Sequence, residues 1–346
     1  MMQIICRIKT ERGLLGGGLL FFSFITILFF GQCKPKAEGT GIRYKKSFQA
    51  ATLSDSSFVS DVRCIRYTSG VFLISDYNRG QVLALNREFR VVKEYGQAGT
   101  GPGEIIGALG VYSNVENLYC VNQAAQTIEV FNINSGIHQL SIRLPTEILG
   151  TTLNTRFFEQ DGIFFLAAPA SGRLVAAFDR DSRVRFKFGE LIPFETAFET
   201  MIRNSSFVFR VAGGKTVVVS DNVPELRFFD SSGNQERKVD LSFIEPVKQR
   251  LHFRSHAPKR ANSFFNLFED VYYQDGLLYL LAIGGKEKPT CNEVVILSFD
   301  ENGVKLGIVV KLDGAWYSAI AVDDSRNMMV YNSTADQLEF YTLLPD

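Results

Sequence analysis

The sequence predicts an all-β protein, a six-bladed β-propeller in which each blade has four antiparallel strands. Three observations support this fold. A unit of about fifty residues, with two short apolar runs separated by a polar loop, occurs six times. The 346-residue chain contains 30 Phe, 12 Tyr and 29 Gly, which favours strands joined by tight turns. A surplus strand precedes the first unit, and the last unit lacks one.

The repeated unit is regular enough to count its strands. The first apolar runs are residues 71–75, 118–121, 163–168, 216–220, 277–282 and 328–331, and the second are 82–85, 128–131, 174–178, 226–229, 294–299 and 338–341. Turns that begin with Asp or Asn follow the second runs, as in FDRDS and FDSSG, because these side chains accept hydrogen bonds from their own backbone. A strand-like segment precedes each first run, and another follows most of the turns, so a complete unit has four strands.

The two ends of the repeat region predict how the ring closes. The last unit ends at LEFYTLL (338–344) without a fourth strand, whereas SFQAATL (47–53) belongs to no unit. A propeller that does not close leaves exposed blade edges. We therefore expect residues 47–53 to pair antiparallel with residues 338–344 as the outer strand of the last blade. The propeller then spans residues 47–346, and the polar residues 33–46 form a tether.

The first 32 residues are predicted to be a lipoprotein-type signal peptide. Basic residues precede an uncharged apolar segment from Gly13 to Gly31, which is the layout of a secretory signal. Cys33 follows this segment and resembles the cysteine of a bacterial lipobox, which implies that it carries the lipid and becomes the mature N-terminus. An uncleaved transmembrane anchor and a secreted protein without lipid are the alternatives. All three place the rest of the chain outside the cytoplasm.

The first unit carries a family resemblance. Residues 74–104, ISDYNRGQVLALNREFRVVKEYGQAGTGPGE, resemble an NHL-type repeat, in which an Asp- and Asn-containing loop precedes a glycine-rich turn ending in GPGE (101–104). The later units lack this turn. The chain from Cys33 onward is similar to the six-bladed propeller lipoproteins of Bacteroidetes, most of which have no assigned activity. The resemblance implies a lipid-anchored protein of a Gram-negative cell envelope.

Two long connections between units contain helix-like inserts. Residues 189–206 place Phe194 and Phe198 at helical spacing. Residues 240–268 contain Pro246, which suits a first helical turn, and are the one locally basic stretch. Connections between the blades of a propeller share a face with the loops that join second and third strands. Both inserts are therefore expected on that face, as a thickened rim, a lid or a docking surface.

The loops between the first and second runs are predicted to form a ligand-binding face. Their charged and amide side chains would surround the mouth of the central channel, which suits a polar ligand such as a glycan or a peptide. The candidates are Asp76, Arg79, Asn122, Gln126, Arg173, Asp221, Glu225, Lys286, Lys288 and Asp336. Asp76, Asn122 and Asp221 also have a structural interpretation, in which they cap their own loops.

A metal-dependent hydrolase or lyase with its site in the central channel is the alternative function. Such a site needs several carboxylates, amides or histidines in the channel. The candidate channel ligands are the carboxylates of Asp61, Glu104, Glu269 and Asp270, which are predicted to lie near the innermost strands. His252 and His256 lie in the second insert with a spacing that can bind a metal on a helix, but they lack a third ligand. No nucleophile elbow, P-loop or dinucleotide fingerprint occurs in the sequence. We therefore predict no catalytic residue and no cofactor, with a divalent metal in the channel as the alternative.

Charge and cysteine content exclude other classes of protein. The 37 basic and 37 acidic residues give no net charge, which argues against a nucleic-acid partner. Five Cys are too few for a disulfide scaffold of this length, and Cys64 and Cys120 lie in apolar runs, as buried thiols do. The predicted function is a lipid-anchored cell-envelope platform that binds a polar ligand or an envelope protein. A structural subunit whose rim insert docks a partner is a third possibility.

Overall fold

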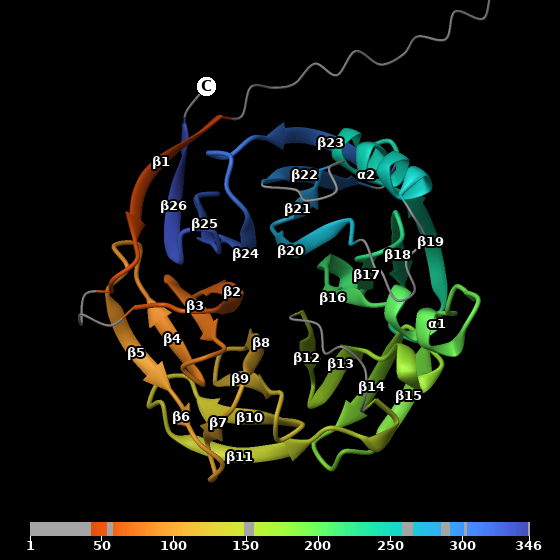
Figure 1. Cartoon of the computed structure of the whole chain (residues 1–346). Helices are drawn as coiled ribbons and strands as arrows, with labels where there is room; N and C mark the ends of the chain where they lie inside the picture. Colours follow the sequence, from red (N-terminus) through yellow and green to blue (C-terminus); the bar gives the residue numbers. More distant parts are fainter. Residues whose placement is uncertain are drawn as a thin grey trace, which may run out of the picture. The chain divides into compact units, whose positions relative to one another are not determined.

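The computed structural model describes residues 43–53, 58–148, 156–257, 266–284, 291–300 and 303–344. These residues form six four-stranded antiparallel sheets, arranged as the blades of a ring (Figure 1). The predicted six-bladed β-propeller is therefore confirmed. The predicted signal peptide with Cys33, and the loop with Lys286 and Lys288, lie outside the described residues. Within the described residues, no helix is long and apolar enough to cross a membrane.

In blades 1 to 5 the strands follow the chain from the ring centre outward, whereas blade 6 has the N-terminal strand β1 as its outermost strand. Blade 1 contains β2 (Val62–Thr68), β3 (Val71–Asp76), β4 (Gln81–Leu85) and β5 (Val91–Tyr95). Blade 2 contains β8 (Ala108–Ser113), β9 (Asn117–Asn122), β10 (Thr127–Asn132) and β11 (His138–Arg143). Blade 3 contains β12 (Phe158–Gln160), β13 (Ile163–Ala167), β14 (Val175–Asp179) and β15 (Val184–Phe188). Blade 4 contains β16 (Ser206–Arg210), β17 (Thr216–Ser220), β18 (Glu225–Phe229) and β19 (Gln235–Asp240). Blade 5 contains β20 (Phe268–Gln274), β21 (Leu277–Ile283), β22 (Asn292–Asp300) and β23 (Gly303–Val310). Blade 6 contains β24 (Tyr317–Val322), β25 (Met328–Asn332), β26 (Gln337–Leu344) and β1 (Arg43–Ala50).

The remaining elements are short and lie between or within blades. They are the parallel pair β6 (Gln97–Ala98) and β7 (Glu104–Ile105), the helices α1 (Ala197–Arg203) and α2 (Glu245–His256), and the 3₁₀ turns η1 (Thr146–Ile148), η2 (Pro169–Ser171) and η3 (Ala212–Gly214).

Burial explains why the two apolar runs of each unit become the middle strands of a blade. Every residue of β9 and of β25 is buried, and because successive side chains point to opposite faces, both faces of these strands are covered by neighbouring blades. Outer strands such as β5 and β11 have mostly partly buried and exposed residues. Aromatic side chains fill the space between blades: the ring of Phe188 in blade 3 lies 5.0 Å from that of Phe229 in blade 4.

The predicted Asp and Asn turns join the third and fourth strands. In blade 4, Oδ1 of Asp230 accepts the backbone N–H groups of Ser232 and Asn234, both at 2.8 Å. Asn86 in blade 1 and Asp179 in blade 3 accept backbone N–H groups two and four residues further on in the same way. These side chains satisfy the backbone of the turn locally, which is why the motif could be read from the sequence.

The N-terminal strand closes the ring, as predicted. β1 pairs antiparallel with β26, from Arg43 opposite Leu344 to Ala50 opposite Leu338. One continuous cluster of buried apolar side chains then joins blades 5, 6 and 1 across the closure.

The limits of the closing strand differ from those predicted. β1 begins at Arg43 and ends at Ala50, so residues 43–46 belong to the blade and not to the tether. Tyr44 packs against the buried cluster, and Lys46 forms an ion pair inside blade 6. Because this segment is rich in basic residues, its sequence does not show the alternation of apolar and polar side chains that is typical of a strand.

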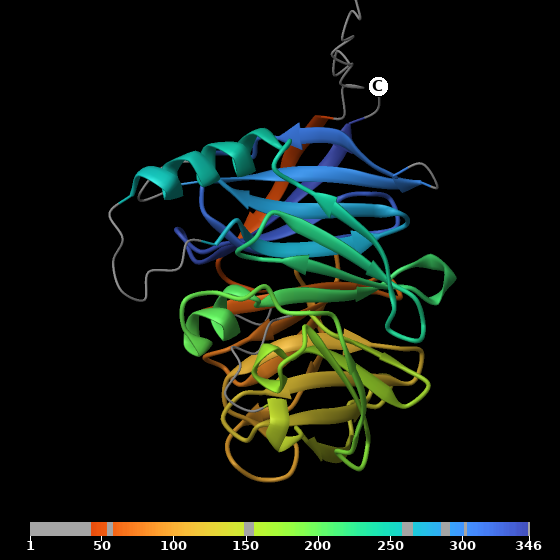
Figure 2. The same cartoon turned by 90° about the vertical axis from the view of Figure 1, so that its right-hand side faces the viewer.

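The ring has two faces. We call the face with the loops between second and third strands and with the connections between blades the loop face, and the opposite one the turn face. The two kinds of segment on the loop face are hydrogen-bonded to each other: the N–H of Tyr77 donates to the carbonyl of Asp61 at 2.8 Å, and the N–H of Ser333 to that of Trp316 at 2.9 Å. Both helices lie on this face (Figure 2), as expected.

The two inserts differ in how well the sequence predicted them. α2 has Pro246 in its first turn and buries Val247, as expected. α1 starts only at Ala197, so Phe194 precedes the helix, and Phe198 is 48% exposed. The amphipathic pattern predicted for the first insert therefore does not correspond to a buried helix face.

Candidate functional site

A buried ion pair fills the ring centre. Arg156, from the connection between blades 2 and 3, binds Asp270 of β20 through two hydrogen bonds, from Nε to Oδ1 at 2.9 Å and from Nη2 to Oδ2. Arg156 is 4% exposed and Asp270 is fully buried. Burial lowers the pKa of the Arg156 guanidinium, but Asp270 more than offsets this and raises it, so the guanidinium stays charged.

The same guanidinium connects the inner strands of three blades. Its Nη1 donates to the carbonyl of Ile65 in β2, and its Nη2 to that of Ile320 in β24, both at 2.7 Å. Asp270 in turn accepts the backbone N–H of Ile320 at 2.9 Å. Blades 1, 5 and 6 are therefore tied together at the ring centre by a side chain that precedes blade 3.

Bulges in the inner strands bring charged side chains to the loop-face end of the ring centre. The pairing register shifts at Arg63 in β2, at Glu269 and Asp270 in β20, and at Ser318 in β24. A bulge leaves its extra residue unpaired and changes the direction of its side chain. The hydroxyl of Ser318 donates to the carbonyl of Val62 at 3.3 Å, so the bulged segments of blades 6 and 1 are in contact.

Arg63, Asp221 and Glu269 form what we call the central charged cluster. Burial raises the pKa of Glu269 to about 7, with a further contribution from Asp270, whereas Arg63 opposes the rise. Burial also raises the pKa of Asp221 to about 7 despite hydrogen bonds from Asn222 and Ser205, and Glu269 adds to this effect. Both carboxyl groups therefore change charge close to neutral pH.

Arg63 is the most accessible member of this cluster. Its side chain is 48% exposed and donates from Nη2 to Asp61 at 2.8 Å, and its guanidinium lies 5.1 Å from the centre of the Tyr77 ring. The guanidinium of Arg63 can donate hydrogen bonds to a polar ligand, and the partly exposed carboxyl group of Glu269 can accept or donate them. The loop-face end of the ring centre is therefore the candidate site.

Two of the predicted ligand-face residues cap their own loops. Oδ1 of Asp76 accepts the N–H of Arg79 at 3.1 Å, and Oδ2 accepts that of Ser60 at 3.0 Å. Oδ1 of Asn122 accepts the N–H of Ala125 at 3.3 Å. Their contacts correspond to the structural interpretation. Asp221, the third residue with that alternative, also accepts a hydrogen bond within its own loop, from Nδ2 of Asn222, and it interacts electrostatically with Glu269.

The other predicted ligand-face residues are spread around the loop face. The side chains of Arg79, Gln126 and Arg173 donate to the backbone carbonyl groups of Phe58, Gln123 and Gly172, respectively. Asp336 accepts a hydrogen bond from the hydroxyl of Tyr331. Glu225 forms ion pairs with Arg227 and Lys238. Lys286 and Lys288 lie outside the described residues. Asp221 is therefore buried near Glu269, whereas the other described residues of this set make separate local contacts.

The candidate metal ligands are also separated. Glu104 accepts the N–H of Gly101 at 2.7 Å, so it stabilises the GPGE turn between blades, and its predicted place near the innermost strands is wrong. His252 and His256 are exposed on α2, with ring centroids 4.4 Å apart. In the part of the chain that the structure describes, no group of three or more His, Cys, Asp or Glu side chains is arranged to hold a metal ion.

Comparison with known proteins identifies the fold. No family model and no curated protein matches the chain, so the NHL resemblance stays a prediction. A member of the DUF4221 family from Bacteroides vulgatus has a TM-score of 0.56 and 10% identity, covering 88% of this chain and 98% of its own. A Bacteroides fragilis protein described as exported has a TM-score of 0.55 and 14% identity, covering 87% and 96%. Virginiamycin B lyase from Staphylococcus aureus has a TM-score of 0.54 and 11% identity, covering 87% and 100%. At these identities the likeness shows the propeller fold alone.

Proposed function

We propose that this protein is a lipid-anchored propeller of the cell envelope that binds a polar ligand, a glycan or a peptide segment of another envelope protein, on its loop face. The observation that carries the proposal is the central charged cluster. Its bulged strands direct Arg63 and Glu269 to the loop-face end of a ring centre that Arg156 and Asp270 fill. A rigid ring with charged groups held at one end of its centre is suited to recognition.

A hydrolase or lyase that uses a metal ion at the ring centre has less support. The virginiamycin B lyase has a similar fold, but fold alone does not carry an activity across. Here both carboxylate oxygens of Asp270 bind Arg156, and Glu104 holds a turn away from the centre. Two of the four candidate acids, Asp270 and Glu104, are therefore occupied in other ways.

The direction of β1 indicates how the anchored protein would be oriented. Arg43 pairs with Leu344, at the end of β26 on the turn face, so the chain enters the ring there. A tether of roughly ten residues between Cys33 and Arg43 spans at most about 35 Å. With the lipid on Cys33, the turn face is close to the membrane, and the loop face is available to ligands away from it.

Substitutions in the central charged cluster test the binding proposal. The full-length protein in detergent would be screened against glycan and peptide arrays, and ligands would be titrated calorimetrically. We expect Arg63→Ala and Glu269→Gln to weaken binding by about tenfold or more, because each removes a charged hydrogen-bonding group. Since Glu269 has a pKa of about 7, a ligand that donates to it should bind more tightly at about pH 8 than at about pH 6, and Glu269→Gln should remove this difference.

The matched control is Arg183→Ala. Arg183 is 70% exposed and, like Arg63, pairs with an aspartate two residues earlier, Asp181, but it lies on a turn of the opposite face. This variant should bind like the unaltered protein. Equal affinities for Arg63→Ala, Glu269→Gln and Arg183→Ala would show that the ligand does not use the central charged cluster.

The lipid anchor has its own test. Cys33→Ser is expected to leave an unprocessed precursor that takes up no labelled palmitate, because only the cysteine thiol accepts the lipid in this class of signal. Cys64→Ser, which changes a buried free thiol of β2, is the control and should be labelled as before. Continued labelling of Cys33→Ser would contradict the lipobox assignment.

A further inference from the structure

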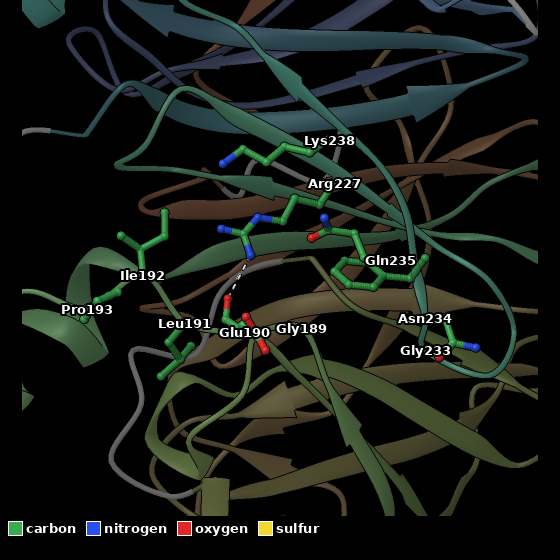
Figure 3. A pocket seen from close by; sticks show the side chains of 11 residues that line it. Gly189, Glu190, Leu191, Ile192, Pro193, Arg227, Gly233, Asn234, Gln235 and Lys238 are labelled. Atoms are coloured by element: carbon green, nitrogen blue, oxygen red, sulfur yellow. Dashed lines mark hydrogen bonds between the residues drawn. The ribbon is translucent and has the colours of Figure 1, made fainter.

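A groove of about 540 Å³ lies between blades 3 and 4 (Figure 3). One wall is the segment Leu191–Pro193, which follows β15, and the other consists of Gly233–Gln235 and β19. This volume is within the range of about 300–1,000 Å³ that small-molecule sites have. No member of the central charged cluster lines the groove, so it is a separate place on the molecule.

The shape of the groove is held by the surrounding structure. The N–H of Ile192 donates to Oδ1 of Asn204 at 2.9 Å, and Nδ2 of Asn204 donates back to the carbonyl of Ile192 at 2.8 Å. Gly189 has a φ of +77°, and a Cβ there would lie 2.9 Å from Cβ of Leu174 and 3.2 Å from the buried ring of Phe229. The apolar wall is therefore fixed in place before any ligand arrives, which lowers the entropy cost of binding.

Arg227 and Lys238 surround the carboxylate of Glu225 at one end of the groove, which the exposed acid Glu190 also lines. Arg227 donates from Nε and Nη2 to one carboxylate oxygen of Glu225, at 3.0 and 2.7 Å, and Lys238 binds the other oxygen. Burial alone would raise the pKa of Glu225, but Lys238 and Arg227 lower it, so the carboxylate is ionised. Two cations thus share one anion. The exposed Glu190 contributes its main-chain carbonyl to Arg227 at 2.8 Å.

Lys238 is placed to bind a further anion. Its side chain is 48% exposed, and an ammonium group has three donors, so the contact with Glu225 leaves donors available. In Figure 3, Lys238 and Arg227 lie between the wall of Leu191, Ile192 and Pro193 and the wall that ends at Gln235. An anionic group and an apolar group therefore meet matching surfaces in the same groove.

We propose that this groove binds a small molecule that carries a carboxylate next to an apolar group, as an apolar amino acid with a blocked amine does. The carboxylate binds the ammonium group of Lys238, and the apolar group packs on Leu191 and Ile192, which are partly exposed at the groove. An ammonium group forms a stronger, charge-assisted hydrogen bond with a carboxylate than with a neutral amide, so Lys238 favours the acid over the corresponding amide.

Titration of the full-length protein with N-acetyl-L-leucine tests the proposal. The backbone amide resonances of Gly189, Gly233 and Asn234 are expected to shift in a saturable way, and N-acetyl-L-leucinamide, which lacks the charge, should bind at least about tenfold more weakly. Lys238→Ala should weaken binding of the acid by about tenfold. Lys215→Ala is the matched control in the same blade, because Lys215 is 45% exposed and also pairs with a glutamate, Glu236. This variant should bind N-acetyl-L-leucine with the affinity of the unaltered protein.

A second variant tests whether the ligand occupies the groove, without changing the charged residues there. Gln235 is exposed at the groove wall, so Gln235→Trp should fill the groove and abolish binding without altering any ion pair. Equal binding of the acid and the amide, or unchanged affinity in both Lys238→Ala and Gln235→Trp, would overturn the proposal. Arg63→Ala should leave this titration unchanged, so the result does not depend on whether the central charged cluster binds a ligand.

Discussion

Removing strand β1 is expected to leave a chain that does not form a stable ring. Deletion of residues 34–50 would keep the predicted lipid anchor and expose the outer edge of β26. The deleted strand pairs with β26 over its whole length, and each lost backbone hydrogen bond costs about 0.5–1.5 kcal/mol net. The sum approaches the roughly 5–15 kcal/mol that stabilises a typical domain, so the shortened protein should aggregate through its open edges.

The buried carboxylate of Glu339 increases this cost. Glu339 is fully buried, and it accepts hydrogen bonds from Tyr317, Tyr341, Asn332, Gln337 and Lys46. Burial alone would raise the pKa of Glu339, but its hydrogen bonds outweigh burial and lower the pKa to about 2. A carboxyl group with a lowered pKa stabilises the fold above its unfolded pKa, and this contribution is lost as the pH falls from about 4.5 towards 2.

Point variants make the prediction quantitative. Lys46→Ala removes the cation that β1 brings to Glu339 at 2.9 Å, which should cost about 1.5–3 kcal/mol and lower the melting temperature measured by circular dichroism. Lys45→Ala changes the exposed neighbour in the same strand and should cost almost nothing. Deletion of residues 34–42 should also be neutral. If the 34–50 deletion melts like the 34–42 deletion, β1 is not needed for closure.

The repeat made the fold predictable, and the missing fourth strand made the closure predictable. Each blade repeats the same apolar runs and caps its own turns, as Asp230 does, so the signals that predict a blade are local in the chain. The start of β1 was less predictable, since Lys46 forms ion pairs with Glu339 and Asp313, which lie in the last blade and in the connection before it. A long-range ion pair leaves no periodic pattern in the sequence.

The candidate site was predicted less well because it depends on pairing between strands. Arg63 and Glu269 reach the loop-face end through register shifts, and the residue at which a strand bulges is decided by its partner. Arg227 lies between two apolar residues of β18, and Lys238 lies in the polar outer strand β19. The segment Leu191–Pro193 forms the opposite wall of the groove beside them. Loop residues such as Asp76 were easier to find, but their contacts are local.

Arg156 is expected to be the single side chain whose loss destabilises the ring centre most. It follows a polar connection in the sequence, where nothing marks it as a core residue. Arg156→Met keeps the apolar part of the side chain but leaves Asp270, which is fully buried, without its cation. Breaking a buried ion pair in this way costs about 3–5 kcal/mol. At about 2–4 °C for each kcal/mol, the melting temperature should fall by roughly 6–20 °C.

The double variant shows whether the ion pair or the packing is responsible. In Arg156→Met combined with Asp270→Asn, no buried charge is left unpaired, so the double variant should be more stable than the sum of the two single losses predicts. Arg173→Met is the control, because Arg173 is exposed and contacts only the carbonyl of Gly172 among the described hydrogen bonds; its melting temperature should stay within about 1–2 °C of the parent. Strictly additive losses in the double variant would mean that Arg156 supports the ring through Ile65 and Ile320, to whose carbonyl groups it also donates, and not through Asp270.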